Sequence, residues 1–85
     1  MQSITYTIKD ELGIHARPAG LVVAEAKKYA SAITIKCGEK SANATRLMAI
    51  MAMGVKCGQE VTISAEGDDE VAAIEGMKQF FEANL

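Results

Sequence analysis

Three segments of this chain alternate apolar and polar residues, and this pattern constrains the fold more than any other feature of the sequence. The segments are residues 3–9, 32–37 and 60–66. A period of two is typical of a strand that buries one face and exposes the other. A Gly38-Glu39 corner after the second segment favours a hairpin that returns through a short strand to Asn43. We therefore expect four short strands, each with a single apolar face.

The first helix is predicted from the only proline of the chain. Pro18 suits the first turn of a helix because its missing N–H has no partner there. Good helix formers continue from it to Lys28 or Tyr29. This helix is expected to place Val22, Ala26 and Tyr29 on its inner face.

Two more helices are predicted further along the chain. Residues 45–53 favour a short helix that ends at Gly54, because glycine adopts the left-handed conformation past a helix end most easily. Residues 70–84 favour a longer helix, preceded by a Gly67-Asp68-Asp69 turn that supplies an N-cap. The apolar positions of this last helix recur at three- and four-residue steps. They are Val71, Ile74, Met77 and Phe81.

The resulting element order, β-α-β-β-α-β-α, predicts the fold class. Strands with one apolar face need a cover, and three helices on one face of the sheet supply it. We therefore expect a two-layer α+β fold. The chain has no internal repeat, linker or low-complexity segment, so residues 1–85 are interpreted as a single domain.

Charge and composition argue against several classes of function. A formal net charge of −2 does not suit a surface that neutralises the phosphates of nucleic acid. No apolar run approaches the roughly 20 residues that span a bilayer, and the N-terminus lacks the pattern of a signal peptide. We therefore expect a cytoplasmic protein with neither nucleic-acid binding nor membrane insertion.

The two cysteines do not indicate a metal centre. Cys37 and Cys57 form no C-x-x-C pair, and the chain has only one histidine to join them. Each is predicted to be a small, semi-buried thiol in a reducing compartment. No metal and no cofactor are expected.

That one histidine stands at the most informative position of the sequence. Residues 13–18 are Gly-Ile-His-Ala-Arg-Pro, so His15 directly precedes a helix that contains Pro18 in its first turn. The unpaired N–H groups at a helix N-terminus favour an anion, and the guanidinium of Arg17 suits phosphate oxygens. Neutral imidazole is a good nucleophile near pH 7. His15 is therefore a candidate acceptor of a phosphoryl group.

A plainer interpretation of the same residues stays open. His15 could cap the helix or lie at the surface without a chemical role, and Arg17 could be a solvated charge. Two features favour a functional site over this plainer interpretation: the predicted helix start next to His15 and the proline that follows it.

The predicted helix at 45–53 carries a second signal. Its inner stripe is expected to contain Leu47, Ile50 and Met51, yet most of its other residues are also apolar. A helix this short cannot bury all of its faces in a small domain. We therefore expect Met48 and a neighbouring residue to face water and to form a docking patch. The alternative is that Met48, Met51 and Met53 fill the core. Gly20 and Leu21 are expected to join this patch if the two helix ends are neighbours.

These residues resemble those of the HPr family, the histidine-containing phosphocarriers of the bacterial phosphoenolpyruvate-dependent sugar phosphotransferase system. The similarity rests on Gly-Ile-His-Ala-Arg-Pro-Ala at 13–19, on the Met/Leu-rich segment closing at Gly54, and on Val-Thr-Ile-Ser-Ala-Glu-Gly at 61–67. It runs essentially end to end. The resemblance implies an open-faced β-sandwich with four antiparallel strands under three helices.

The resemblance also implies a pathway. Enzyme I, itself phosphorylated by phosphoenolpyruvate, would phosphorylate His15 on Nδ1, and sugar-specific IIA domains would take the group from there. Arg17 would steady the phosphoryl group. The apolar contact surface would comprise Leu47, Met48, Met51 and Gly54. A carrier that meets many partners in turn needs small interfaces, and we expect a monomer.

One position departs from the family pattern. Gram-positive members carry a regulatory serine at the start of the second helix, and the matching residue here is Arg46. Arginine cannot be phosphorylated by the kinase that modifies this serine. Thr45 has a hydroxyl group, but it lies one residue before the position of the regulatory serine, and neighbouring residues of a helix point in different directions.

Three other functions compete with the sugar-uptake carrier. A paralogue in a regulatory or nitrogen-related phosphotransfer chain would need the same histidine. An interaction module without phosphorylation would use the methionine-rich helix alone. A hydrolase is disfavoured, because the sequence offers no metal cluster, no phosphate-binding glycine-rich loop and no second general base.

Overall fold

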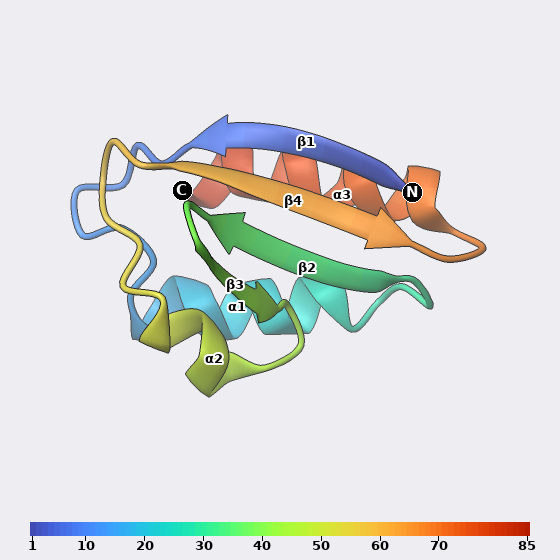
Figure 1. Cartoon of the computed structure of the whole chain (residues 1–85), viewed down its shortest axis with the longest axis horizontal. Helices are drawn as coiled ribbons and strands as arrows, with labels where there is room; N and C mark the ends of the chain where they lie inside the picture. Colours follow the sequence, from blue (N-terminus) through green and yellow to red (C-terminus); the bar gives the residue numbers. More distant parts are fainter.

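The computed structural model describes all residues 1–85 and contains four strands and three helices in the predicted order. Their bounds are β1 Gln2–Thr7, α1 Ala16–Ala26, β2 Ala32–Cys37, β3 Lys40–Asn43, α2 Leu47–Ala52, β4 Glu60–Glu66 and α3 Glu70–Asn84. The strands form one antiparallel sheet in the order β1-β4-β2-β3. Figure 1 shows this sheet with the helices behind and below it.

The register of the sheet explains why one of its faces is apolar. Ile63 of β4 lies opposite Ile4 of β1 on one side and Ile35 of β2 on the other. Residues directly opposite each other in neighbouring strands share a face, so these isoleucines point to the same layer. Thr62 and Ser64, on the other face, stay partly exposed. The fold is therefore the expected two-layer α+β open-faced β-sandwich.

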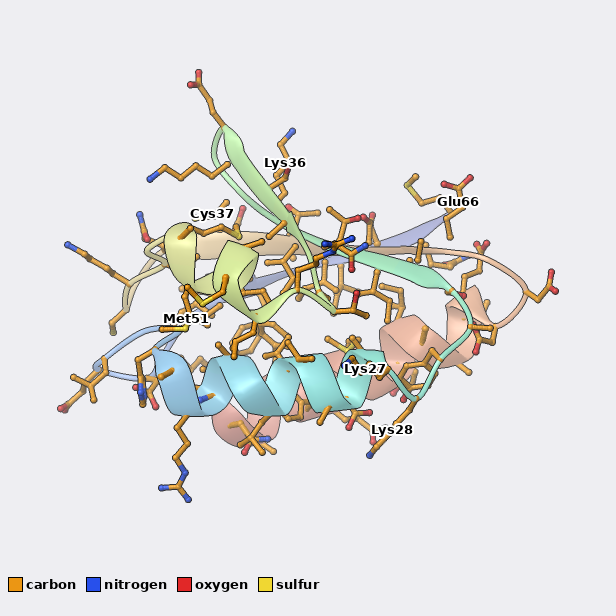
Figure 2. The ribbon with its side chains drawn as sticks, turned by 90° about the horizontal axis from the view of Figure 1, so that it is seen from below. Lys27, Lys28, Lys36, Cys37, Met51 and Glu66 are labelled. Carbon is orange, nitrogen blue, oxygen red and sulfur yellow. The ribbon has the colours of Figure 1, made fainter.

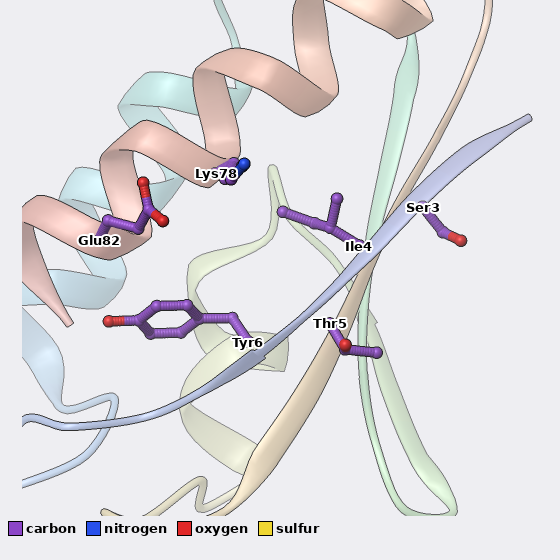
Figure 3. Close-up of a pocket in the computed structure, with 6 residues that line it drawn as sticks. All are labelled: Ser3, Ile4, Thr5, Tyr6, Lys78 and Glu82. Atoms are coloured by element: carbon purple, nitrogen blue, oxygen red, sulfur yellow. The ribbon is translucent and has the colours of Figure 1, made fainter.

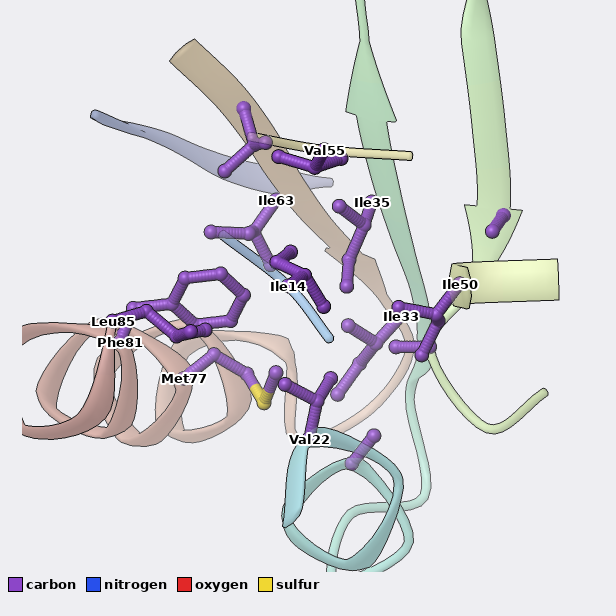
Figure 4. Packing of buried hydrophobic residues seen from close by; sticks show 14 of the residues in the cluster. Ile14, Val22, Ile33, Ile35, Ile50, Val55, Ile63, Met77, Phe81 and Leu85 are labelled. Carbon is purple, nitrogen blue, oxygen red and sulfur yellow. The ribbon is translucent and has the colours of Figure 1, made fainter. Parts of the chain in front are cut away.

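The helices supply the other layer of the core (Figure 4). α3 packs on β1 and β4, while α1 packs on α3 and α2. Phe81 of α3 is fully buried and meets the ring of Tyr6 edge to face, with 5.8 Å between centroids. Burying a side chain of this size contributes roughly 1.5–3 kcal/mol.

The structure corrects the bounds of the first strand and the first helix. Ile8 is buried but lies beyond β1, where its N–H donates to the carbonyl of Gln59. α1 begins two residues before Pro18 and ends at Ala26 instead of continuing to residues 28–29. The N–H groups of Lys28 and Tyr29 bond three residues back, so the helix tightens into a turn there.

α3 corrects two sequence predictions. Val71, expected on the inner stripe, is 67% exposed. The buried positions are Ala73, Ile74, Met77 and Phe81. At about 100° per residue, Val71 falls off the face that these residues define. Asp69 is the N-cap residue, as expected, but its side chain makes no cap hydrogen bond.

The two cysteines differ in their surroundings. Cys37 is half-buried, as predicted, whereas Cys57 is exposed. The prediction of a semi-buried thiol was therefore wrong for Cys57. This residue lies in the loop between α2 and β4.

Candidate functional site

A tight approach between two loops fixes the segment that leads to His15. Gly13 has φ +68°, and a Cβ at this position would lie 2.2 Å from the carbonyl oxygen of Val55. Next to it, the N–H of Ile14 donates to the same carbonyl at 3.0 Å, and the Ile14 side chain is buried. Only glycine fits such a position without strain. The backbone before His15 is therefore held in place.

His15 is the N-cap residue of α1. Its backbone is extended, with φ −101°, and its carbonyl accepts the first hydrogen bond of the helix from the N–H of Ala19 at 2.9 Å. The imidazole makes no cap hydrogen bond and is 38% exposed. The ring is therefore accessible and does not serve as a side-chain cap.

Unpaired donors surround the start of α1. The N–H groups of Ala16 and Arg17 make no hydrogen bond within the protein, and Pro18 has no N–H to satisfy. Unsatisfied N–H groups at a helix N-terminus carry the positive end of the helix dipole. An anion attached to the neighbouring ring of His15 would meet these donors.

The ring opens onto a shallow depression of about 230 Å³. Its lining residues are Asp10, His15, Arg17, Pro18, Leu21 and Asn84. The Arg17 side chain is exposed and forms no ion pair, so its guanidinium is free to bind an anion. The structure thus brings His15 and Arg17 together, as the sequence predicted.

Asp10 is a site residue that the sequence analysis missed. One carboxylate oxygen, Oδ1, lies 3.9 Å from Nε2 of His15. This proximity depends on the turn between the two residues, where Asp10 Oδ1 accepts a hydrogen bond from the N–H of Leu12 at 2.9 Å. An aspartate that can open an Asx turn a few residues before His15 is the sequence signal that could have identified it.

α2 is shorter than predicted and exposes more of its surface. It ends at Ala52, followed by Gly54 with φ +62°, so the predicted stop at Gly54 is confirmed. Of the expected inner stripe, only Ile50 is buried, whereas Leu47 and Met51 are exposed. The stripe prediction was therefore wrong for these two residues. A six-residue helix can turn only about one face fully inward.

α1 and α2 each expose large apolar side chains, which we call together the apolar patch: Leu21, Leu47, Met48 and Met51. Met48 is 75% exposed, as predicted, while Met53 is buried in the core. The two helices pack against each other. Figure 2 shows Met51 on the side of the molecule where α1 begins, whereas Lys27 and Lys28 lie where α1 ends. Gly20 is also exposed in the first turns of α1.

Arg46 and Thr45 precede α2. Arg46 is the N-cap residue and is exposed, without a side-chain cap hydrogen bond. Thr45 donates from its hydroxyl group and its N–H to Oδ1 of Asn43, at 2.6 and 2.9 Å. The threonine hydroxyl is therefore engaged locally, away from the first turn of the helix.

A larger depression, of about 470 Å³, lies between β1 and α3 (Figure 3). Ile4 and Tyr6 point toward α3, and Ser3 and Thr5 point away from it. Lys78 and Glu82 are its charged residues. None of its lining residues lines the depression beside His15.

Two kinds of structural feature are absent from the protein. No group of three or more His, Cys, Asp or Glu side chains is arranged to hold a metal ion. None of the three helices combines the length and the apolar character that crossing a membrane requires.

Fold and site together define a small α+β protein that presents a partly exposed histidine beside unpaired N–H donors at a helix start. A family model described as "PTS HPr component phosphorylation site" matches residues 2–83. The chain therefore belongs to the HPr family, the phosphocarrier proteins of the phosphotransferase system.

Individual relatives agree with this assignment. The chain is 44% identical over 79 residues to "Phosphocarrier protein HPr" of Mycoplasma capricolum subsp. capricolum, covering 93% of this chain and 89% of the relative. A crystal structure of HPr from Thermoanaerobacter tengcongensis has 43% identity and a TM-score of 0.92, covering 98% and 93% of the two chains. A structure described as an HPr dimer from the same organism has 43% identity and a TM-score of 0.77, covering 98% and 95%.

Proposed function

We propose that this protein accepts a phosphoryl group on His15 from enzyme I and passes it to IIA components of sugar permeases. The observation that carries the proposal is the accessible imidazole of His15 beside the unpaired N–H groups of Ala16 and Arg17. Family membership supports the phosphocarrier role. We propose that both transfers take place in the cytoplasm.

Phosphoryl transfer to His15 needs a nucleophile and groups that stabilise the negative charge of the phosphoryl oxygens. The lone pair of Nδ1 attacks the phosphorus atom, the bond from phosphorus to the donor breaks, and the donor keeps that electron pair. The new N–P bond places three phosphoryl oxygens beside the start of α1. The helix donors and the Arg17 guanidinium stabilise their charge. No hydrolytic water is required, because the next partner removes the group.

The apolar patch is the proposed docking surface, together with Gly20 and Gly54. Its leucines and methionines are exposed although a small protein generally buries such residues. Methionine side chains are flexible and polarisable, so one patch can repack against enzyme I and against different IIA domains. A patch next to His15 lets each partner contact both, and we propose that the carrier acts as a monomer in these encounters.

The residue at position 46 decides whether a serine-directed kinase can modify this protein. Arg46 offers no hydroxyl group, and the Thr45 hydroxyl donates to Asn43. We therefore propose that this protein lacks the serine-directed kinase branch. An Arg46→Ser variant incubated with that kinase and ATP should gain a phosphoryl group, and the parent should not.

The downstream partner distinguishes sugar uptake from a regulatory chain. Phosphorylated parent protein should be incubated separately with IIA domains of sugar permeases and with a nitrogen-related IIA domain. The proposal predicts that a sugar-specific domain removes the phosphoryl group faster. Preferential transfer to the nitrogen-related domain would support the paralogue function, and binding without any phosphorylation would support an interaction module.

A further inference from the structure

We propose that Asp10 is a positioning residue for His15, which holds the proton on Nε2 and leaves the lone pair on Nδ1. This inference rests on the proposed function, because it concerns how His15 receives and releases a phosphoryl group. Oδ1 of Asp10 is 3.9 Å from Nε2, and both side chains line the same depression. The other charged side chain in that lining is Arg17.

The backbone of Asp10 is fixed from two directions. The backbone oxygen of Leu85 accepts hydrogen bonds from the N–H groups of Lys9 and Asp10, at 2.6 and 2.8 Å. Leu85 is itself buried. On the other side, the Asp10 carbonyl accepts from the N–H of Gly13 at 2.9 Å. The end of α3 and the loop before His15 therefore hold Asp10 at a set distance from the ring.

The Asp10 side chain is also oriented. Its Oδ1 accepts from the N–H of Leu12, which closes a local turn. The same oxygen is the one that faces Nε2 of His15. Both contacts require an oxygen at this position, but only the effect on His15 requires a negative charge.

A carboxylate beside Nε2 favours the tautomer with its proton on that nitrogen, because an N–H bond pointing at the charge is stabilised. The lone pair is then on Nδ1. When Nδ1 bonds to phosphorus and the donor leaves with its electron pair, the ring keeps the Nε2 proton and becomes cationic. The carboxylate stabilises that charge. In the next transfer the N–P bond breaks, and the electron pair returns to Nδ1.

The same carboxylate repels an incoming phosphoryl group, which opposes this effect. Asp10 lies on the Nε2 side of the ring, whereas the phosphoryl group bonds to Nδ1. Coulomb interactions weaken with distance and with solvent between the charges. We therefore expect the stabilisation of the ring to exceed the repulsion of the phosphoryl oxygens.

The test compares Asp10→Asn with Glu11→Gln. Asparagine keeps an oxygen that can accept from Leu12 and removes the charge. The control removes the same charge from the next residue, which is exposed and does not line the depression. Two quantities are measured: the fraction of neutral His15 with its proton on Nε2, from ¹⁵N chemical shifts, and the kinetics of phosphorylation by enzyme I.

Asp10→Asn should lower the Nε2–H fraction and slow phosphoryl transfer about two- to fivefold at unchanged KM, the size expected of a partly exposed ion pair. Glu11→Gln should change neither. An unchanged tautomer fraction, or faster transfer in Asp10→Asn, would overturn the role of Asp10. If the parent gains no phosphoryl group, the proposed function fails, while the tautomer measurement still decides whether Asp10 orients the ring.

Discussion

The carboxylate of Asp69 accepts hydrogen bonds from both the N–H and the hydroxyl group of Ser31, which lies 38 residues earlier in the chain. It also accepts from the N–H of Ala30 at 2.8 Å. These bonds join the start of α3 to the loop between α1 and β2. They favour the charged carboxylate, and the Ser31 hydroxyl is the main reason that the pKa of Asp69 is lowered from its ordinary value of 3.8.

Acid should therefore destabilise the protein partly through Asp69. A carboxyl group whose pKa is lowered by folding contributes stability above its unfolded pKa and loses it as the pH falls through the folded pKa. Asp69→Asn should lower the unfolding temperature at neutral pH and flatten its decline on acidification. The check is thermal unfolding from neutral pH to about pH 2. Asp68→Asn, which removes the exposed charge of the preceding residue, should show the same dependence of unfolding temperature on pH as the parent.

Two glycines should respond in opposite ways to alanine. Gly13→Ala places a Cβ against the carbonyl of Val55 at φ +68°, so it should cost more than the roughly 1–2 kcal/mol of left-handed strain alone. Gly20→Ala meets no atom within 4 Å inside a helix and should stabilise by about 0.5–1 kcal/mol. Urea unfolding of both variants measures the difference. Equal free energies of unfolding would contradict the close approach of the two loops.

Substitution of two methionines in and next to α2 distinguishes a core residue from a residue of the docking surface. Met53→Ala should cost about 2–5 kcal/mol, because this side chain is 6% exposed. Met48→Ala should change the free energy of unfolding by less than about 0.5 kcal/mol. It should instead raise the KM of enzyme I for the carrier. If Met48→Ala unfolded easily and kept the parent KM, the patch would belong to the core.

Much of the fold could be predicted because its signals are local. The isoleucines of β2 and β4 alternate, and their buried faces match that pattern. The bounds of α3 match the prediction, but the way its first turn is capped does not, because a contact distant in sequence decides it. The side chain of Asp69 accepts hydrogen bonds from Ser31 instead of capping α3. No pattern within residues 67–70 predicts that choice.

In the candidate site too, local sequence patterns identified some residues, whereas others are placed by contacts distant in sequence. His15 and Arg17 were identified because they share one short segment with the start of a helix. Asp10 was missed because its place depends on the turn at Leu12 and on the hydrogen bonds that Lys9 and Asp10 donate to the oxygen of Leu85. Leu47 and Met51 were misplaced because the sequence does not reveal how α2 is rotated against β3. Three-dimensional packing thus supplied what spacing alone did not.

Phosphoryl transfer to His15 is tested most directly by the intact mass of the protein after incubation with phosphoenolpyruvate and enzyme I, beside a His15→Ala variant. The parent should gain the mass of one acid-labile phosphoryl group, and the variant should gain none. A parent that stays unmodified by active enzyme I, or a variant that is modified equally, would contradict His15 as the phosphoryl acceptor.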